Sequence, residues 1–295
     1  MSDRESCVER GHAVLVSLAH RFPQLYVAPG DDAGEAHRLA RLRGVVPPNA
    51  NLDHFHGSAD DELRVVSTPA GPVEVVFLKE RADFETFLQV VGHKSAPVPI
   101  ARTVGAITYC GLADWSEIAA AHERYLASGG TDWSSAFARL AKEPGAFRTE
   151  LVVISEGPYS NVPAGQTPYD EDAWLPISRE IRLHHECAHV VCRRTMPDDI
   201  LPVWDEVTAD VVGLLCATGG YDADLAARFL GVAVDGFVGG RLEEYLNDDQ
   251  AGCIDRVAAE VYGALRQIAQ TCGQDDVSGP FGYLLRLKAE PLLRY

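Results

Sequence analysis

The residues of this chain best suited to chemistry are two histidines one helical turn apart, with a glutamate beside the first. His185, Glu186 and His189 form the pattern H-E-x-x-H. On an α-helix, positions i and i+4 lie on one face, so both imidazoles can approach a single ion from the same side. Zinc in a hydrolytic site usually takes three protein ligands and keeps a fourth position for water. The pattern therefore predicts two ligands of a zinc site and requires a third.

A carboxylate downstream supplies the third ligand. Glu206 is followed one helical turn later by Asp210. A ligating imidazole usually donates its other N–H to a carboxylate or carbonyl, so we expect Asp210 to orient the imidazole of His185. Asp205 competes with Glu206 as the third ligand, but on a helix it points away from Asp210. We therefore predict Glu206 as the ligand that joins His185 and His189.

Glu186 has the position of a general base. Zinc lowers the pKa of a bound water towards neutrality, so a neighbouring carboxylate can take its proton at pH 7. Glu186 lies about 100° around the helix from His185, close enough to face that water without being a ligand. The alternative is a buried helix whose two histidines only satisfy hydrogen bonds in a core.

At these residues the chain resembles the gluzincin-type zinc metallopeptidases, the thermolysin-like branch of the zincins. That family carries H-E-x-x-H on an active-site helix and E-x-x-x-D on a second helix, and the resemblance covers residues 148–216. It implies a zincin-like fold, Zn²⁺ as the cofactor, a peptide substrate, and the same roles for the ligands, the base and the orienting aspartate. The wider pattern, which includes residues 157–163 and 205–210, also resembles an uncharacterised bacterial family that implies no substrate.

Thermolysin-like enzymes place a histidine or tyrosine downstream to stabilise the oxyanion that forms during hydrolysis. No histidine follows His189 in this chain. Arg241 and Tyr245 are our preferred donors, because they follow two glycines and share a helical face. The remaining candidates are Tyr221, Arg228, Tyr262, Tyr283 and residues of the N-terminal half.

Two helices must position these residues. Acidic residues at 170–172 and arginines at 193–194 predict a helix over 172–194. Pro202 begins a second helix that ends near Cys216, and the connection over 195–201 is short enough to bring its carboxylate back to the imidazoles. The β-branched run 150–155 predicts a strand just before the first helix. The family resemblance implies an edge strand there, to which an extended peptide can add; an ordinary core strand is the alternative.

The remaining patterns predict an α+β, zincin-like fold with a small mixed sheet, the active-site helix and a mostly helical C-terminal part. The strand-like runs 63–68 and 72–78, on either side of Ala70-Gly71, predict a β-hairpin. The segment Pro97-Val98-Pro99 marks a boundary between an N-terminal α+β region, 1–98, and a catalytic region, 99–295; one continuous domain is the alternative. The predicted C-terminal helices cover 223–230, 241–246, 250–272 and 280–293.

Composition limits the partners. The chain has 295 residues and a formal net charge of −17. Binding to nucleic acid and to anionic membranes is disfavoured, because phosphate groups require clustered lysine and arginine. We find no secretory signal and no run long enough to cross a bilayer. Seven cysteines without C-x-x-C spacing indicate a reduced, cytoplasmic protein.

Together these features predict a zinc-dependent hydrolase, in first place a peptidase acting on a peptide or small amide. Two histidines and one carboxylate also form the site of non-haem Fe(II) enzymes. An oxygenase needs no base beside the first ligand, so Glu186 favours hydrolysis. A non-catalytic metal-binding protein is the third hypothesis. The sequence leaves the oligomeric state open.

Overall fold

The computed structural model describes residues 13–196, 201–272 and 279–293. The chain divides into two compact units, each built from several stretches. The first comprises Met1–Val65, Glu74–Ala101 and Thr108–Ser155, and the second comprises Val66–Val73, Arg102–Ile107 and Glu156–Tyr295. The boundary near Pro97-Val98-Pro99 stays a prediction.

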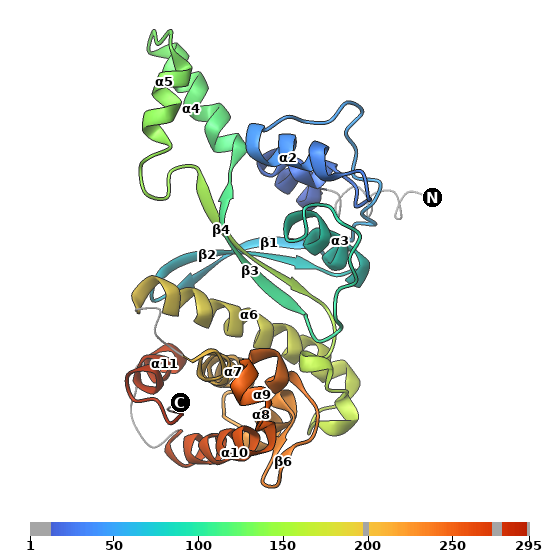
Figure 1. Ribbon diagram of the computed structural model, residues 1–295, viewed down its shortest axis with the longest axis vertical. Coiled ribbons are helices and arrows are strands. Elements are labelled where there is room, and N and C mark those ends of the chain that lie inside the picture. Colours follow the sequence, from blue (N-terminus) through green and yellow to red (C-terminus); the bar gives the residue numbers. More distant parts are fainter. Residues whose placement is uncertain (1–12, 197–200, 273–278, 294–295) are drawn as a thin grey trace. The chain divides into compact units, whose positions relative to one another are not determined.

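A four-stranded mixed sheet has the order β1-β2-β4-β3 (Figure 1). Its strands are β1 (Glu62–Thr68), β2 (Gly71–Leu78), β3 (Ala106–Ala113) and β4 (Arg148–Ser155). β1 and β2 form the predicted hairpin, in which Gly71 takes φ +102°, a conformation that glycine adopts without steric cost. β2 runs parallel to β4, with Val75 opposite Val152.

The expectation that residues 150–155 form an edge strand was wrong. β4 lies between β2 and β3, so neighbouring strands occupy both of its hydrogen-bonding edges and an added peptide cannot pair there. Leu151, Val152, Val153 and Ile154 are all fully buried. A continuous apolar run of this kind is typical of a strand covered on both faces. The ordinary core strand was therefore the correct alternative.

Helices complete the first unit. In addition to the helical residues 13–21, these are η1 (Pro23–Tyr26), α2 (Gly34–Arg43), α3 (Arg81–Val91), α4 (Trp115–Ala127) and α5 (Trp133–Leu140). Figure 1 shows α4 and α5 as a helical hairpin between β3 and β4. Asp114 follows the last residue of β3 and caps α4. Its carboxylate accepts hydrogen bonds from the backbone N–H groups of Ser116 and Glu117.

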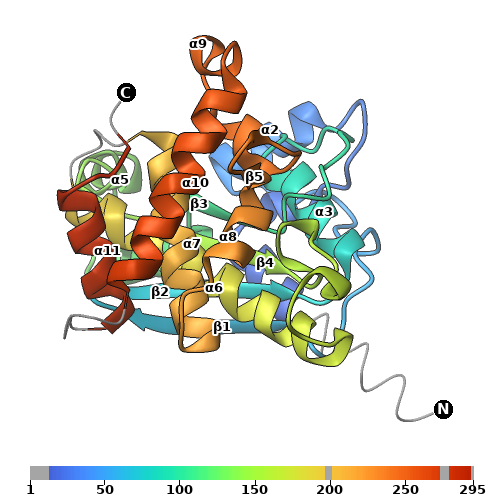
Figure 2. The same cartoon turned by 90° about the horizontal axis from the view of Figure 1, so that it is seen from below.

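The second unit is mostly helical, which confirms the predicted α+β class (Figure 2). Its elements are η2 (Tyr159–Asn161), η3 (Ala164–Gln166), α6 (Glu171–Thr195), α7 (Pro202–Thr218), α8 (Ala223–Leu230), β5 (Val232–Ala233), β6 (Gly236–Phe237), η4 (Arg241–Tyr245), α9 (Asp248–Ala251), α10 (Ile254–Thr271) and α11 (Gly279–Ala289). None of the helices in the described ranges combines the length and apolar character needed to cross a bilayer.

The two predicted site helices are confirmed as α6 and α7. α6 begins after Asp170, whose side chain accepts a hydrogen bond from the backbone of Ala173. α7 begins with Pro202 and ends at Gly219 in the left-handed conformation, φ +74°. Part of the predicted connection, residues 197–200, lies outside the described residues.

α6 and α7 approach each other closely at one glycine. A Cβ atom on Gly213 would lie 2.8 Å from the carbonyl oxygen of Ile181, closer than real Cβ atoms come to other atoms. Any larger residue there would push the helices apart. The contact therefore sets the distance over which carboxylates of α7 can reach imidazoles of α6.

Candidate metal centre

His185 and His189 of α6 converge with Glu206 of α7 on one point. The Nε2 atoms of the two imidazoles are 3.0 Å apart. The Glu206 carboxylate places Oε2 3.3 Å from Nε2 of His185 and Oε1 3.4 Å from Nε2 of His189. These three residues form a group with the ligand types and spacing to hold a metal ion. The structure thus brings together the three predicted ligands.

The distances suit a small divalent cation. Ligand atoms bound at about 2.0–2.1 Å to one tetrahedral zinc ion lie about 3.3 Å from one another. The observed separations of 3.0, 3.3 and 3.4 Å, the last two measured to different oxygens of Glu206, are close to this value. Burial acts against ionisation of Glu206, but hydrogen bonds from His185 and His189 outweigh it and hold the pKa of Glu206 well below its usual value. The carboxylate is therefore ionised, as a metal ligand must be.

His185, His189 and Glu206 are called the trio below. Each of its two imidazoles has a carboxylate beside its other ring nitrogen. Nδ1 of His185 lies 2.9 Å from Oδ1 of Asp210, the residue predicted for this position. Nδ1 of His189 lies 2.8 Å from Oδ2 of Asp205. Such contacts fix the tautomer that leaves Nε2 free to bind a metal. The sequence analysis considered Asp205 only as an alternative ligand and missed this contact, although a second imidazole needing its own acceptor was an available signal.

Asp205 also forms an ion pair with a buried lysine. The ammonium group of Lys288, on α11, contacts its carboxylate, and the Lys288 side chain is fully buried. Burial tends to raise the pKa of Asp205, but His189 and Lys288 lower it to well below its usual range. The carboxylate that orients His189 is therefore ionised.

Tyr159, in η2, was also missed as a site residue. Its hydroxyl donates a hydrogen bond of 2.5 Å to Oδ1 of Asp210 and lies 2.9 Å from Nδ1 of His185. Its ring packs edge-on against Phe229, with centroids 4.7 Å apart. The Tyr159 side chain is thus held beside the same carboxylate oxygen that receives the imidazole.

The segment before Tyr159 is anchored to α6. Arg182, one turn before His185, donates hydrogen bonds of 2.6 and 2.7 Å to the carbonyl oxygens of Gly157 and Pro158. The backbone N–H of Tyr159 donates to Oγ of Ser178 at 2.9 Å. The helix that carries the histidines therefore also positions the tyrosine. In the sequence, this segment belonged to the wider family-like pattern but carried no recognisable role.

Arg241, in η4, reaches the other oxygen of Asp210. Its Nη2 donates a 2.7 Å hydrogen bond to Oδ2, and its Nη1 lies 3.8 Å from Oε2 of Glu206. Its guanidinium group also lies 5.0 Å from the centre of the Tyr159 ring. Burial acts to lower the pKa of Arg241, but the charge of Asp210 outweighs it and raises that pKa well above its usual value. Arg241, predicted as an oxyanion donor, is thus bound in part to a carboxylate.

Tyr245, the other preferred oxyanion donor, is half-buried at the end of η4. Burial raises the pKa of its hydroxyl, and the positive charge of Arg241 opposes this effect. Glu206 raises it further, by its charge and by a hydrogen bond. The hydroxyl therefore stays protonated at neutral pH and lies beside the trio, where it can donate a hydrogen bond.

The other candidate donors differ in their surroundings. The hydroxyl of Tyr221 is buried and has no hydrogen-bond partner in the part of the chain that the structure describes. Tyr262 interacts with Arg266. The Tyr283 hydroxyl lies 2.6 Å from that of Thr271. Arg228 lines a cavity together with Tyr262. Among these three tyrosines, only Tyr221 has a hydroxyl without a hydrogen-bond partner in the described residues.

The predicted base, Glu186, is nearly buried on α6, with 9 % of its surface exposed. It follows His185 directly, so its side chain leaves the helix about 100° from the imidazole. It is not a member of the trio.

Replacing Asp205 by asparagine is expected to weaken zinc binding by about 10–100-fold, because loss of the charged acceptor leaves the His189 tautomer less firmly set. Competition with a chromophoric chelator measures this affinity. Asp224→Asn, at an exposed aspartate on α8, is the matched control and should leave the affinity unchanged. Equal affinities for the two variants would remove Asp205 from the site.

Comparison with curated proteins found no match, and comparison with solved structures found none. Comparison with protein families found one match, which spans residues 13–275 and includes α6, α7 and η4. The matched range covers most of the chain and includes His185, His189 and Glu206. The chain therefore belongs to the family described as "Family of unknown function (DUF7005)".

Proposed function

We propose that this protein is a zinc-dependent hydrolase that cleaves a peptide or small amide, with His185, His189 and Glu206 as the metal ligands. The observation that carries the proposal is the convergence of the two imidazole Nε2 atoms, 3.0 Å apart, on the carboxylate of Glu206, whose Oε2 lies 3.3 Å from His185 and whose Oε1 lies 3.4 Å from His189. When bound, zinc acidifies a coordinated water and polarises the carbonyl of the substrate. Asp210 and Asp205 hold the two imidazoles in the tautomers that such binding needs.

The residue beside the first ligand favours a zinc hydrolase over a non-haem iron enzyme. Glu186 follows His185 directly, where it can act as a general base. An oxygenase with two histidines and one carboxylate needs no base at that position. A 2-His-1-carboxylate Fe(II) enzyme therefore remains the second hypothesis.

Two features favour catalysis over a purely structural site. Structural zinc usually has four protein ligands, whereas the group formed by the described residues offers three. The side chains of His189 and Glu206 keep 12 % and 17 % of their surface exposed, so a substrate can approach from that side. These two features argue against the third hypothesis, a non-catalytic metal-binding protein.

We assign the surrounding residues the roles that such a hydrolysis requires. Glu186 accepts the proton released as water attacks the carbonyl carbon, and later gives it to the leaving nitrogen. Tyr245 donates a hydrogen bond to the oxygen that becomes negative during this attack. Arg241 and Tyr159 hold Asp210, and through it His185, in place. We therefore reassign Arg241 from oxyanion donor to positioning residue.

Removing the Tyr245 hydroxyl is expected to lower turnover by about a hundredfold, because one donor to the developing oxyanion is lost. The change is Tyr245→Phe, and zinc content should stay at the level of the unaltered protein. Steady-state kinetics together with elemental analysis test both statements. Tyr262→Phe, which alters an exposed hydroxyl paired with Arg266, is the control. Unchanged turnover in Tyr245→Phe would transfer this role to Tyr221.

The function itself is tested on protein purified without added metal. Elemental analysis is expected to find about one zinc ion per chain, and mass spectrometry of a peptide and amide library should detect cleaved products. A chelator should abolish the cleavage, and added zinc should restore it. Iron in place of zinc would favour the oxygenase hypothesis. Bound zinc without cleavage of any peptide or amide would favour a binding role. Because β4 is not an edge strand, the choice between peptides and small amides rests on this assay.

A further inference from the structure

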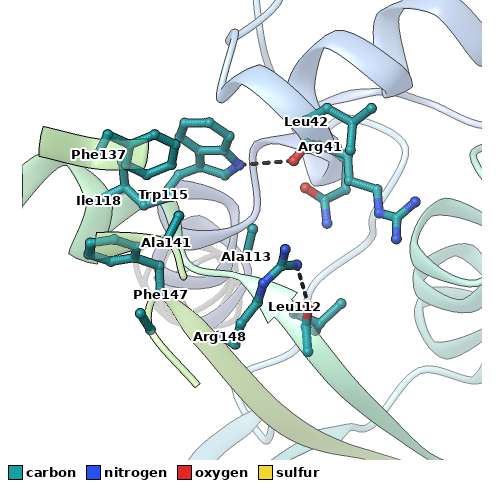
Figure 3. A pocket seen from close by; sticks show the side chains of 13 residues that line it. Arg41, Leu42, Leu112, Ala113, Trp115, Ile118, Phe137, Ala141, Phe147 and Arg148 are labelled. Atoms are coloured by element: carbon teal, nitrogen blue, oxygen red, sulfur yellow. Dashed lines mark hydrogen bonds between the residues drawn. The ribbon is translucent and has the colours of Figure 1, made fainter. Parts of the chain in front are cut away.

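The first unit contains a cavity of about 240 Å³ bordered by α2, α4, α5 and the adjoining ends of β3 and β4 (Figure 3). Its lining residues include three with aromatic rings, Trp115, Phe137 and Phe147, and two arginines, Arg41 and Arg148. Among the residues that the structure describes, none with a carboxylate side chain lines it. The whole chain has 43 acidic and 26 basic residues, so a lining with two arginines and no acid departs from the general surface. The cavity therefore suits an anion.

The Trp115 wall is held from two sides. Its indole Nε1 donates a 3.1 Å hydrogen bond to the carbonyl oxygen of Arg41, drawn as a dashed line in Figure 3. Its ring lies over Gly44, where a Cβ atom would come within 2.4 Å of the ring. Gly44 also has φ +66°, which ends α2 and favours glycine. The end of α2 and the indole of Trp115 thus pack closely together, and this packing fixes the position of the ring.

The two phenylalanines form the adjoining wall. Their rings stack with centroids 5.7 Å apart and planes inclined by 27°. Phe147 has φ +56°, a left-handed conformation that bulky residues seldom adopt, and its carbonyl oxygen accepts a 2.9 Å hydrogen bond from the backbone N–H of Asp114. Strain of this kind persists where the surrounding structure fixes the residue, often at a binding site. The backbone conformation of Phe147 and its hydrogen bond with Asp114 therefore determine where its ring lies.

Polar groups complete the cavity. Nη1 of Arg148 donates a 2.8 Å hydrogen bond to the carbonyl oxygen of Gly111, which holds its guanidinium group while other N–H donors stay available. Gln24 also lines the cavity and is only 3 % exposed. Its Oε1 has no hydrogen-bond partner within the described residues. Buried polar atoms almost always have a partner, and an amide oxygen accepts, so this atom points to an N–H or O–H donor from a ligand or a water.

We propose that this cavity binds a small aromatic carboxylate, with its ring against Trp115, Phe137 and Phe147 and its carboxylate on Arg41 and Arg148. Planar guanidinium groups bind carboxylates through paired, charge-assisted hydrogen bonds, and aromatic rings pack against one another in offset or edge-on contact. The cavity is smaller than the usual pocket for a drug-sized molecule, so the ligand has a single ring or two fused rings. The site is separate from the metal centre and does not depend on the proposed hydrolysis.

Ligand-observed NMR titrations of the full chain test the proposal with three probes of similar size. Indole-3-acetate carries both a ring and a carboxylate, indole-3-acetamide lacks the charge, and hexanoate lacks the ring. We expect indole-3-acetate to bind at least about tenfold more tightly than either of the others, because each lacks one of the two contacts. Equal binding of the acetate and the amide would overturn the anion site, and so would the absence of acetate binding at 10 mM, taken as about the weakest useful affinity.

Variants then locate the binding. Arg41→Gln and Arg148→Gln should each weaken indole-3-acetate binding by about tenfold while leaving indole-3-acetamide binding unchanged. Both side chains are exposed, so the fold should tolerate the changes. Arg139→Gln, at an exposed arginine of α5 that does not line the cavity, is the control and should bind like the unaltered protein. Undiminished acetate binding in the double variant Arg41→Gln, Arg148→Gln would place the ligand elsewhere and overturn the proposal.

Discussion

Replacing Glu186 by glutamine is expected to leave the zinc content unchanged and to lower hydrolytic turnover by about 10²–10⁴-fold. Glutamine has nearly the same shape as glutamate but cannot accept a proton at neutral pH. The three metal ligands are untouched by the change, since Glu186 is not part of the trio. Elemental analysis and kcat/KM on the best substrate of the library measure the two quantities.

Glu180→Gln is the matched control for this variant. Glu180 lies on the same helix and is 43 % exposed at its side chain, where it pairs with His184 at 3.6 Å. Its replacement should change neither zinc content nor turnover. If Glu186→Gln hydrolysed its substrate as fast as the unaltered protein, Glu186 would not be the base. If that variant instead lost its zinc, its role would be in holding the metal centre.

Replacing Arg241 by methionine is expected to lower the free energy of unfolding by about 3–5 kcal/mol. Asp210 is 1 % exposed, and its Oδ2 accepts the 2.7 Å hydrogen bond from Arg241. Without the guanidinium group, this oxygen loses its charged partner, and the contacts of Oδ1 with Tyr159 and His185 are left to compensate the buried charge. Methionine fills similar space, so lost packing contributes little. Denaturant titration of the metal-free protein measures the difference.

Arg266→Met provides the contrast. Arg266 pairs with Asp224, but both side chains are largely exposed, at 44 % and 66 %. Water solvates both charges there, so the free energy of unfolding should fall far less than in Arg241→Met. A double variant, Asp210→Asn with Arg241→Met, should recover part of the stability lost in Arg241→Met, because the buried charge is removed. Similar losses in Arg241→Met and Arg266→Met would mean that Asp210 does not need its buried partner.

The buried network around Asp210 explains why the centre needs more residues than its three ligands. Asp210 accepts hydrogen bonds from Tyr159 and Arg241 and lies 2.9 Å from Nδ1 of His185. These donors leave the carboxylate little freedom to turn. The imidazole of His185 is consequently held in one orientation, with its Nε2 directed at His189 and Glu206. Precise placement of a ligand in this way is what metal affinity and turnover depend on.

The sequence by itself determined what depends on neighbouring residues along the chain. His185 and His189 share a face of α6 because helical periodicity is local, and the same periodicity places Glu206 and Asp210 together on α7. Capping and breaking residues limit both helices, so their bounds were also predictable. Hence the ligand trio could be predicted without coordinates.

Only the tertiary structure decided the partners that come from distant parts of the chain. Tyr159 and Arg241 stand 51 and 31 positions from Asp210, and no periodicity connects them to it. The contact of Asp205 with His189 depends on how α7 lies against α6, which the close approach at Gly213 sets. The same reason applies to β4, since strand order is a property of the whole sheet. Local sequence encodes the helices and their faces, whereas packing between elements determines which side chains finally meet.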